Sequence, residues 1–173
     1  MTTVLVTGPI GSGKSAVCRH LQARGYAVYD CDSRCKALYD EVPGLKARLE
    51  QELGIPFTEL RRIFEDDALR EKLESIVYPL LVKDLQAWKA SLDGDLSFIE
   101  SAVALGKPCF DGLYDKVLLV TAPRGVRESR NPEVARRDAL QTFDASKADY
   151  TITNAGSIES LHRETDKLLK KLI

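Results

Sequence analysis

Eight residues near the start of the sequence have the types and spacing of a phosphate-binding loop. Gly8-Pro9-Ile10-Gly11-Ser12-Gly13-Lys14-Ser15 matches the pattern G-x-x-x-x-G-K-[ST]. Glycine permits the backbone angles and close approaches that turn successive N–H groups inward on a phosphate. Lys14 adds a charge for the β- and γ-phosphates of a nucleotide, and Ser15 adds a hydroxyl for Mg²⁺. The stretch therefore predicts a nucleoside triphosphate site.

The elements on either side of this loop occur in the order that such a site needs. The apolar run Val4-Leu5-Val6 predicts a strand before the loop, and residues 16–24 favour a helix after it. The start of that helix supplies unpaired N–H groups and the positive end of its dipole. Because the motif has its strand-loop-helix context, we interpret it as functional rather than as a chance match.

Two acidic residues follow the second predicted strand. Ala27-Val28-Tyr29 ends in Asp30-Cys31-Asp32. Ligands of open parallel sheets bind at the carboxyl ends of the strands, so at least one of Asp30 and Asp32 is expected in the site. The alternative is an ordinary helix cap, a position that Asp favours, and this alternative stays open for Asp30.

Residues 43–93 contain no predicted strand. Leucines recur there at helical spacing, and a long apolar stripe runs from Asp66 to Trp88. Pro79 lies inside this stripe, where its missing N–H should kink the helix or split it in two. The stretch is expected to form a helical insert between the second and third strands.

Three further strands are predicted after this insert. They are Leu96-Ser97-Phe98-Ile99, Lys116–Thr121 and Tyr150–Thr153. Short strands that alternate with helices call for a parallel sheet with right-handed crossovers. The expected fold is a single three-layer α/β/α domain over residues 1–173 with a five-stranded parallel sheet.

The segment 124–143 is rich in arginine and follows the fourth predicted strand at its ligand end. A charged run is commonly a solvated face. Phosphoryl transfer, however, needs positive charge on the transferring group, so at least one of these arginines is expected to reach the phosphates. The arginines are Arg124, Arg127, Arg130, Arg136 and Arg137.

Composition excludes several other classes of protein. Lys and Arg number 25 against 26 Asp and Glu, so the net charge of −1 gives no general attraction to nucleic acid or an anionic membrane. No apolar run is long enough to span a bilayer and the start lacks a signal core, which predicts a cytoplasmic protein. The cysteines lack the paired spacing of a metal or redox motif and are expected to be reduced thiols. They are Cys18, Cys31, Cys35 and Cys109.

Three motifs together resemble those of the bacterial dephospho-CoA kinases. The first is the phosphate loop, and the second is Tyr29-Asp30-Cys31-Asp32, which is similar to the family's strand-ending D-x-D. The third and most specific is Ala148-Asp149-Tyr150-Thr151-Ile152-Thr153-Asn154-Ala155-Gly156, similar to the family's A-D-x-x-I-x-N-x-G. The resemblance implies a P-loop kinase fold whose five parallel strands are arranged as in nucleoside monophosphate kinases.

The same resemblance implies an ATP-dependent phosphotransferase. Such an enzyme uses Mg²⁺ and moves the γ-phosphoryl of ATP onto the ribose 3′-hydroxyl of dephospho-coenzyme A, the last step of coenzyme A biosynthesis. Residues 43–93 would bind this acceptor, and 124–143 would form a lid that is shorter than the family's usual one. The partner would be this small molecule rather than nucleic acid or a membrane, and protein partners are left open.

Residue roles follow from the positions that match the family. Asp32 would be the base, with Lys14 and a lid arginine, Arg130 or else Arg127, as the other catalytic groups. Asp32, Asp30 and Tyr78 would contact the acceptor, although Asp30 is also suited to cap a helix or to hold Mg²⁺ through water. Tyr78 stands where the family more often has His. The ATP ligands would be Gly11, Ser12, Gly13, Lys14, Ser15, Ala16 and Asn154, with Ser15 also on Mg²⁺ and Asn154 beside the adenine.

Two other classes stay open on the sequence alone. Shikimate-type and nucleotide kinases share the phosphate loop, but no glycine triplet between the third and fourth strands is present to hold a carboxylic acid. The other class is a nucleotide-binding protein without transfer activity. The guanine-reading N-K-x-D of a GTPase switch is absent, whereas the short lid is compatible with a lapsed kinase.

Overall fold

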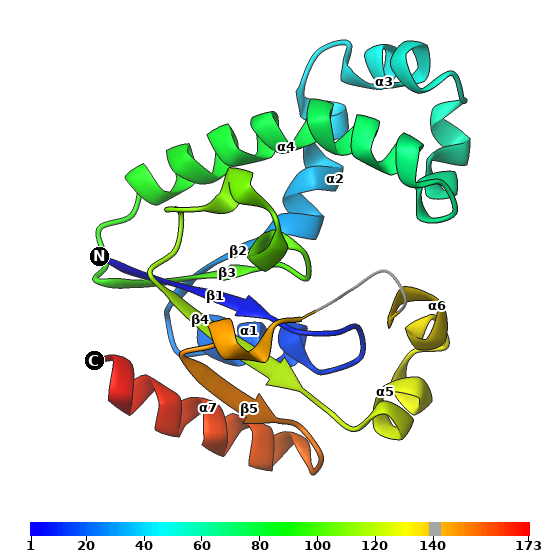
Figure 1. Cartoon of the computed structure of the whole chain (residues 1–173). Helices are drawn as coiled ribbons and strands as arrows, with labels where there is room; N and C mark the ends of the chain where they lie inside the picture. Colours follow the sequence, from blue (N-terminus) through cyan, green and yellow to red (C-terminus); the bar gives the residue numbers. More distant parts are fainter. Residues whose placement is uncertain (139–142) are drawn as a thin grey trace. The chain divides into compact units, whose positions relative to one another are not determined.

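The computed structural model describes residues 1–138 and 143–173, which form two compact units. The first unit is Met1–Asp30 together with Leu92–Ile173, and it contains the β-sheet. The second unit, Cys31–Ser91, is entirely helical (Figure 1). Each unit has its own hydrophobic core.

The sheet has five strands in the order β2-β3-β1-β4-β5, and every neighbouring pair is parallel. This arrangement confirms the predicted five-stranded parallel sheet flanked by helices. It also places the carboxyl ends of all the strands at one edge, where the phosphate loop follows β1. The strands are β1 (Thr2–Thr7), β2 (Ala27–Asp30), β3 (Leu96–Glu100), β4 (Lys116–Thr121) and β5 (Tyr150–Thr153).

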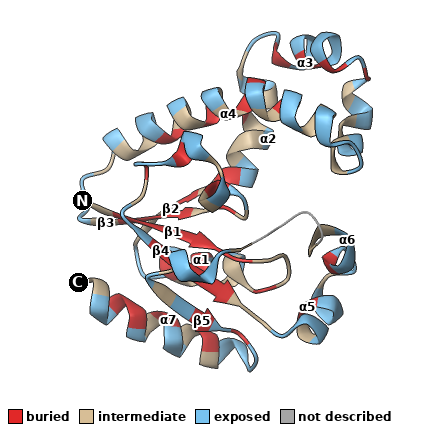
Figure 2. Ribbon diagram, in the orientation of Figure 1, coloured by how far each residue is buried: buried red, intermediate tan, exposed pale blue. Residues whose placement is uncertain are grey.

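The central strand β1 is buried on both faces. Successive side chains of a strand point to opposite sides, so different residues cover the two faces. Val4 and Val6 join the core formed with α1 (Lys14–Ala23) and α7 (Ile158–Leu172). Leu5, on the opposite face, is fully buried as well. Figure 2 shows the buried strands at the centre of this unit. A continuous apolar strand is typical of a parallel sheet covered on both sides.

Short helices connect the later strands. After β3 come two 3₁₀ turns, η2 (Ala104–Gly106) and η3 (Pro108–Phe110). After β4 come α5 (Arg124–Arg130) and α6 (Val134–Asp138). The 3₁₀ turn η4 (Ala145–Lys147) precedes β5. The segment from α5 to α6 therefore lies within the predicted lid, of which residues 139–142 fall outside the described residues.

The helical unit begins earlier than the expected insert of 43–93, because it also includes α2. Its core gathers Leu45, Leu49 and Leu53 of α3 with Leu73 and Ile76 of α4. The elements are α2 (Cys31–Glu41), α3 (Leu45–Leu53), the 3₁₀ helix η1 (Phe57–Phe64) and α4 (Asp67–Ala90).

Helix α4 continues through Pro79 without a break. Of the two outcomes expected at this residue, a kink or a split, the split is therefore wrong. A proline inside a helix costs about 3 kcal/mol. The side chains of Ile76, Val77 and Leu81, on both sides of the proline, are buried. Since burial of each such side chain contributes roughly 1.5–3 kcal/mol, packing outweighs the lost hydrogen bond.

The four cysteines are free thiols, two of them buried, one half-buried and one exposed. Within the described ranges, no helix combines the length and the apolar character that crossing a bilayer would require.

Candidate active site

The backbone of the phosphate loop has the conformation that its glycines were expected to permit. Gly8, Gly11 and Gly13 have φ angles of +145°, +76° and +103°. A Cβ atom on Gly8 would lie 2.0 Å from the carbonyl oxygen of Val120, and one on Gly13 would lie 2.3 Å from Nδ2 of Asn154. Side chains at these two positions would collide with fixed neighbours, so the loop requires glycine there for reasons of space as well as of φ.

Lys14 lies at the first position of α1, and its side chain curls back over the loop. The ammonium Nζ donates to the carbonyl oxygens of Gly8 at 2.7 Å and of Pro9 at 3.1 Å. The charge is thus held above the same turn whose N–H groups would receive a phosphate. An anionic phosphate oxygen is a stronger acceptor for an ammonium than a neutral carbonyl is.

Asn154 directly follows β5 and holds the phosphate loop in place. Its Nδ2 donates to the carbonyl of Ser12 at 3.0 Å, and the side chain is buried. Its own backbone N–H donates to the carbonyl of Thr121 at 2.7 Å, which continues the pairing of β4 with β5. The resemblance implied a place beside the adenine for Asn154. The structure adds a direct hydrogen bond to the loop, which the sequence analysis missed.

Asp149, from the same motif, lies at the opposite end of β5. Its carboxylate accepts from the backbone N–H of Val117 at 2.8 Å, and it pairs with Lys116 at 3.4 Å. The motif from 148 to 156 therefore spans the length of one strand. Its aspartate anchors the start of β4, and only its asparagine reaches the phosphate loop.

Glu100 is a site residue that the sequence analysis did not single out. It ends β3, and its Oε1 accepts from the hydroxyl of Ser15 at 2.6 Å. Asp30, the last residue of β2, is its partner in the strand register. The available signal was the one used for Asp30, an acidic residue directly after a buried strand. Together these side chains provide hydroxyl and carboxylate oxygens, the ligand type that Mg²⁺ prefers.

The pKa of the Cys18 thiol is affected by the charges of Glu100, Asp30 and Lys14. Burial raises the pKa of its thiol well above the usual value, and the charges of Glu100 and Asp30 raise it further, whereas Lys14 opposes them. The thiol is therefore protonated at neutral pH and is a poor nucleophile, because reactivity requires the thiolate. The acidic groups and the ammonium share one neighbourhood at the start of α1.

The two arginines favoured from the sequence differ in their surroundings. Arg130 is exposed, and its Nη1 donates to the carbonyl of Gly11 at 3.2 Å. Arg127 is buried and pairs with Asp138 at 2.7 Å. Both side chains donate to carbonyl oxygens of the loop, Arg127 to that of Ile10 and Arg130 to that of Gly11. Of the two, Arg130 is the one whose guanidinium is exposed to solvent. Of the other arginines, Arg124 pairs with Glu128 on the same helix.

The remaining predicted residues belong to the helical unit. Asp32 is in the first turn of α2, two residues along the chain from Asp30, which ends β2. Tyr78 is half-buried in α4, and its hydroxyl donates to Oε1 of Glu74 at 3.2 Å. The sheet unit thus brings together the loop, Lys14, Ser15, Asp30, Asn154 and Arg130, while Asp32 and Tyr78 are carried by the second unit.

Comparisons with known proteins agree with this geometry. The sequence profile of the family described as Dephospho-CoA kinase matches residues 2–159. A protein of Porphyromonas gingivalis named Dephospho-CoA kinase is 36% identical over 176 residues, which cover 90% of this chain and 87% of the relative. One of that name from Aquifex aeolicus is 31% identical over 193 residues, covering 99% and 98%.

Solved structures extend the comparison to the fold. The crystal structure of TT1252 from Thermus thermophilus has a TM-score of 0.81 and 29% identity, and the match covers 99% of this chain and 98% of that one. Shikimate kinase from Acinetobacter baumannii has a TM-score of 0.58 at 17% identity, covering 99% and 94%. The second likeness concerns the fold alone.

Proposed function

The chain belongs to the dephospho-CoA kinase family, whose members are ATP-dependent transferases, and from this premise we propose how its own residues carry the reaction. The γ-phosphoryl of ATP passes to the ribose 3′-hydroxyl of dephospho-CoA. The observation that supports this most directly is the glycine loop with Lys14 folded over it. The reaction would take place in the cytoplasm.

The loop binds the phosphates of ATP. Backbone N–H groups of the loop and of the first turn of α1 receive the phosphate oxygens, and Lys14 exchanges its carbonyl partners for the β- and γ-phosphates. Two hydroxyls support a polar ligand here, because Oγ1 of Thr7 and Oγ of Ser12 are buried and have no hydrogen-bond partner among the residues that the structure describes. Buried polar groups of this kind normally require one.

Mg²⁺ fits the oxygens gathered at the end of β3. Ser15 and Glu100 would hold the ion, with Asp30 in reach through water, and the ion would neutralise charge on the β- and γ-phosphates. Their close contact supports this assignment, since Oγ of Ser15 and Oε1 of Glu100 lie 2.6 Å apart. Glu100 is added to the set predicted from the sequence.

Asp32 is the base for the acceptor. The proton of the ribose hydroxyl passes to its carboxylate, the hydroxyl oxygen bonds to the γ-phosphorus, and the bond from that phosphorus to the bridging oxygen breaks to release ADP. Its position in the first turn of α2, directly beyond the end of β2, supports this role. Asp30 and Tyr78 are proposed as further acceptor contacts, and residues 43–93 as the acceptor-binding segment.

Arg130 is proposed as the arginine that stabilises the transferring group. Replacing it with alanine is expected to lower kcat by about 10²-fold, because it removes a cation that strengthens its contact in the transition state. The side chain is exposed, so the melting temperature should not change. Steady-state kinetics and a thermal melt test this, with Arg136→Ala as the matched control.

Full activity of Arg130→Ala together with a loss of activity in Arg136→Ala would instead assign the stabilisation of the transferring group to Arg136, in α6.

The acceptor is tested by ATP consumption against a panel of compounds. We expect turnover with dephospho-CoA and Mg²⁺, and none with shikimate, with nucleoside monophosphates, without an acceptor or with Mg²⁺ chelated. Turnover only with another compound would contradict the proposed acceptor. ATP binding without turnover on any acceptor would favour a nucleotide-binding protein that has lost transfer activity.

A further inference from the structure

Arg127 is a charged side chain in an unusually enclosed place. Its side chain is only 10% exposed, although it lies on a short helix at the surface of the sheet unit. The guanidinium reaches two carbonyl oxygens of the main chain: Nε donates to that of Ala122 at 3.2 Å, and Nη1 donates to that of Ile10 at 3.4 Å. One side chain thus joins the end of β4 to the phosphate loop.

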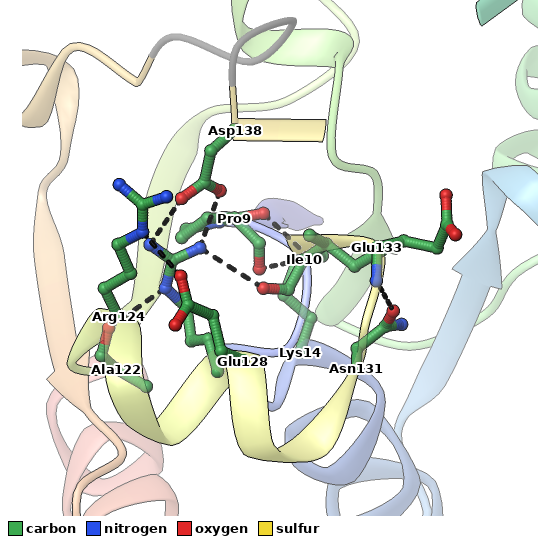
Figure 3. A network of polar contacts seen from close by, with 11 residues as sticks. Pro9, Ile10, Lys14, Ala122, Arg124, Glu128, Asn131, Glu133 and Asp138 are labelled. Carbon is green, nitrogen blue, oxygen red and sulfur yellow. Dashed lines mark hydrogen bonds and ion pairs between the residues drawn. The ribbon is translucent and has the colours of Figure 1, made fainter. Parts of the chain in front are cut away.

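Asp138 completes the set of partners. Its two oxygens accept from Nη1 and Nη2 of Arg127 at 2.7 and 2.8 Å, a bidentate pair that fixes the plane of the guanidinium. The hydrogen bonds from Arg127 lower the pKa of this carboxyl, so the pair is charged at neutral pH. Asp138 ends α6 and has no contact with the loop itself among the hydrogen bonds of the described residues (Figure 3). It therefore acts on the loop through Arg127.

The main chain of α5 also lies against the loop. A Cβ atom on Gly11 would be 2.9 Å from the carbonyl oxygen of Arg127. One turn further along α5, Arg130 donates to the carbonyl of Gly11. The loop at Ile10 and Gly11 is therefore contacted by two residues of α5, Arg127 and Arg130.

These contacts determine where the loop's N–H groups point. In a planar trans peptide, the carbonyl and the following N–H point in opposite directions. A donor that holds the carbonyl of Ile10 from outside therefore turns the N–H of Gly11 inward. In the same way Asn154, which holds the carbonyl of Ser12, turns the N–H of Gly13 inward. Two peptide planes of the loop are thus set by side chains more than a hundred residues away.

We propose that Arg127 and Asp138 are positioning residues that orient the phosphate loop for ATP. This inference rests on the proposed function, because it assumes that the loop receives the phosphates. The sequence analysis considered Arg127 as a possible lid arginine. In this proposal Arg127 supports the loop instead, and Arg130 contacts the transferring group.

The first test is Asp138→Asn, compared with Glu133→Gln as the control. Glu133 lies in the same segment, and its carboxylate pairs only loosely with the exposed Arg136, at 3.6 Å. Both variants remove one negative charge. Asp138→Asn is expected to raise the KM for ATP about tenfold and to weaken a non-hydrolysable ATP analogue equally, with the KM for dephospho-CoA nearly unchanged. Glu133→Gln should match the wild type in all three.

A second test separates positioning from stability. Asp138→Asn also leaves a buried guanidinium without its counter-charge, which by itself destabilises the protein. The double variant Arg127→Met/Asp138→Leu removes both charges and restores apolar contact, so its melting temperature should recover. The carbonyls of Ile10 and Ala122 would still lack their donor, and the KM for ATP should therefore stay raised. Should the double variant not fold, Arg127→Lys keeps the charge but loses the planar fork, and it should raise the KM for ATP as well.

Recovery of wild-type ATP affinity together with stability in the double variant would overturn the inference, as would an Asp138→Asn variant equal to Glu133→Gln. If the wild type itself does not phosphorylate dephospho-CoA, the proposed function fails instead. The binding of the ATP analogue by the same variants would still decide the role of the pair.

Discussion

Replacing Lys14 by alanine is expected to abolish phosphoryl transfer, with a loss of more than about 10³-fold, and to weaken ATP binding. The ammonium lies over the loop, 2.7 Å from the carbonyl of Gly8, where it would meet the β- and γ-phosphates. Its charge is needed most when negative charge develops on the bridging oxygen, so kcat should fall together with affinity. Single-turnover kinetics and calorimetry with an ATP analogue measure the two effects.

The matched control is Lys170→Ala, which removes an exposed lysine near the end of α7 and should leave both quantities unchanged. Lys14→Arg is informative as well, because a planar guanidinium cannot replace a compact ammonium inside a narrow turn. Retention of wild-type turnover in Lys14→Ala would remove the loop from the mechanism.

The second large effect concerns Asp32. We expect Asp32→Asn to reduce transfer by about 10²-fold or more, because the amide keeps the shape of the side chain but cannot accept the proton of the ribose hydroxyl. ATP affinity should stay within a few-fold of the wild type. A rapid-quench measurement of transfer to dephospho-CoA, with ATP-analogue binding in parallel, tests both statements.

Asp30→Asn serves as the comparison for this variant. Asp30 is the last residue of β2, opposite Glu100 in the strand register, and its loss should cost less than that of Asp32. If Asp30→Asn were the inactive variant and Asp32→Asn turned over normally, the two roles would have to be exchanged.

The sheet and the loop were predictable from the sequence because their signals are local. Each of the five strands is short and rich in apolar or β-branched residues, and the loop is a motif of consecutive residues. The order β2-β3-β1-β4-β5 is not local, and periodicity does not give it. The resemblance implied five parallel strands arranged as in nucleoside monophosphate kinases, without stating their order. Helix caps are local contacts as well: Ser157 caps α7 by accepting from the backbone N–H of Ser160.

The parts that the sequence analysis missed all depend on contacts between distant residues. Asn154 meets Ser12 across 142 positions, and Glu100 meets Ser15 across 85. No periodicity records such pairs. The choice between a kink and a split at Pro79 stayed open for a related reason, since the local rule for proline takes no account of the burial of its neighbours. Arg127 was grouped with the other arginines because its burial cannot be inferred from composition.

The central place of β1 in the sheet has a consequence for the order in which the protein is completed during synthesis. β1 leaves the ribosome first, yet its neighbours β3 and β4 begin only at Leu96 and Lys116. Pairings of this kind, between distant parts of a chain, form slowly, whereas the core of the unit Cys31–Ser91 uses contacts within that stretch alone. The helical unit can therefore fold before the strands that pair with β1 and β2 have been synthesised. The phosphate loop is completed only after β5 has been made, because its support at Ser12 comes from Asn154, and nascent chains that end before β5 are expected not to retain ATP.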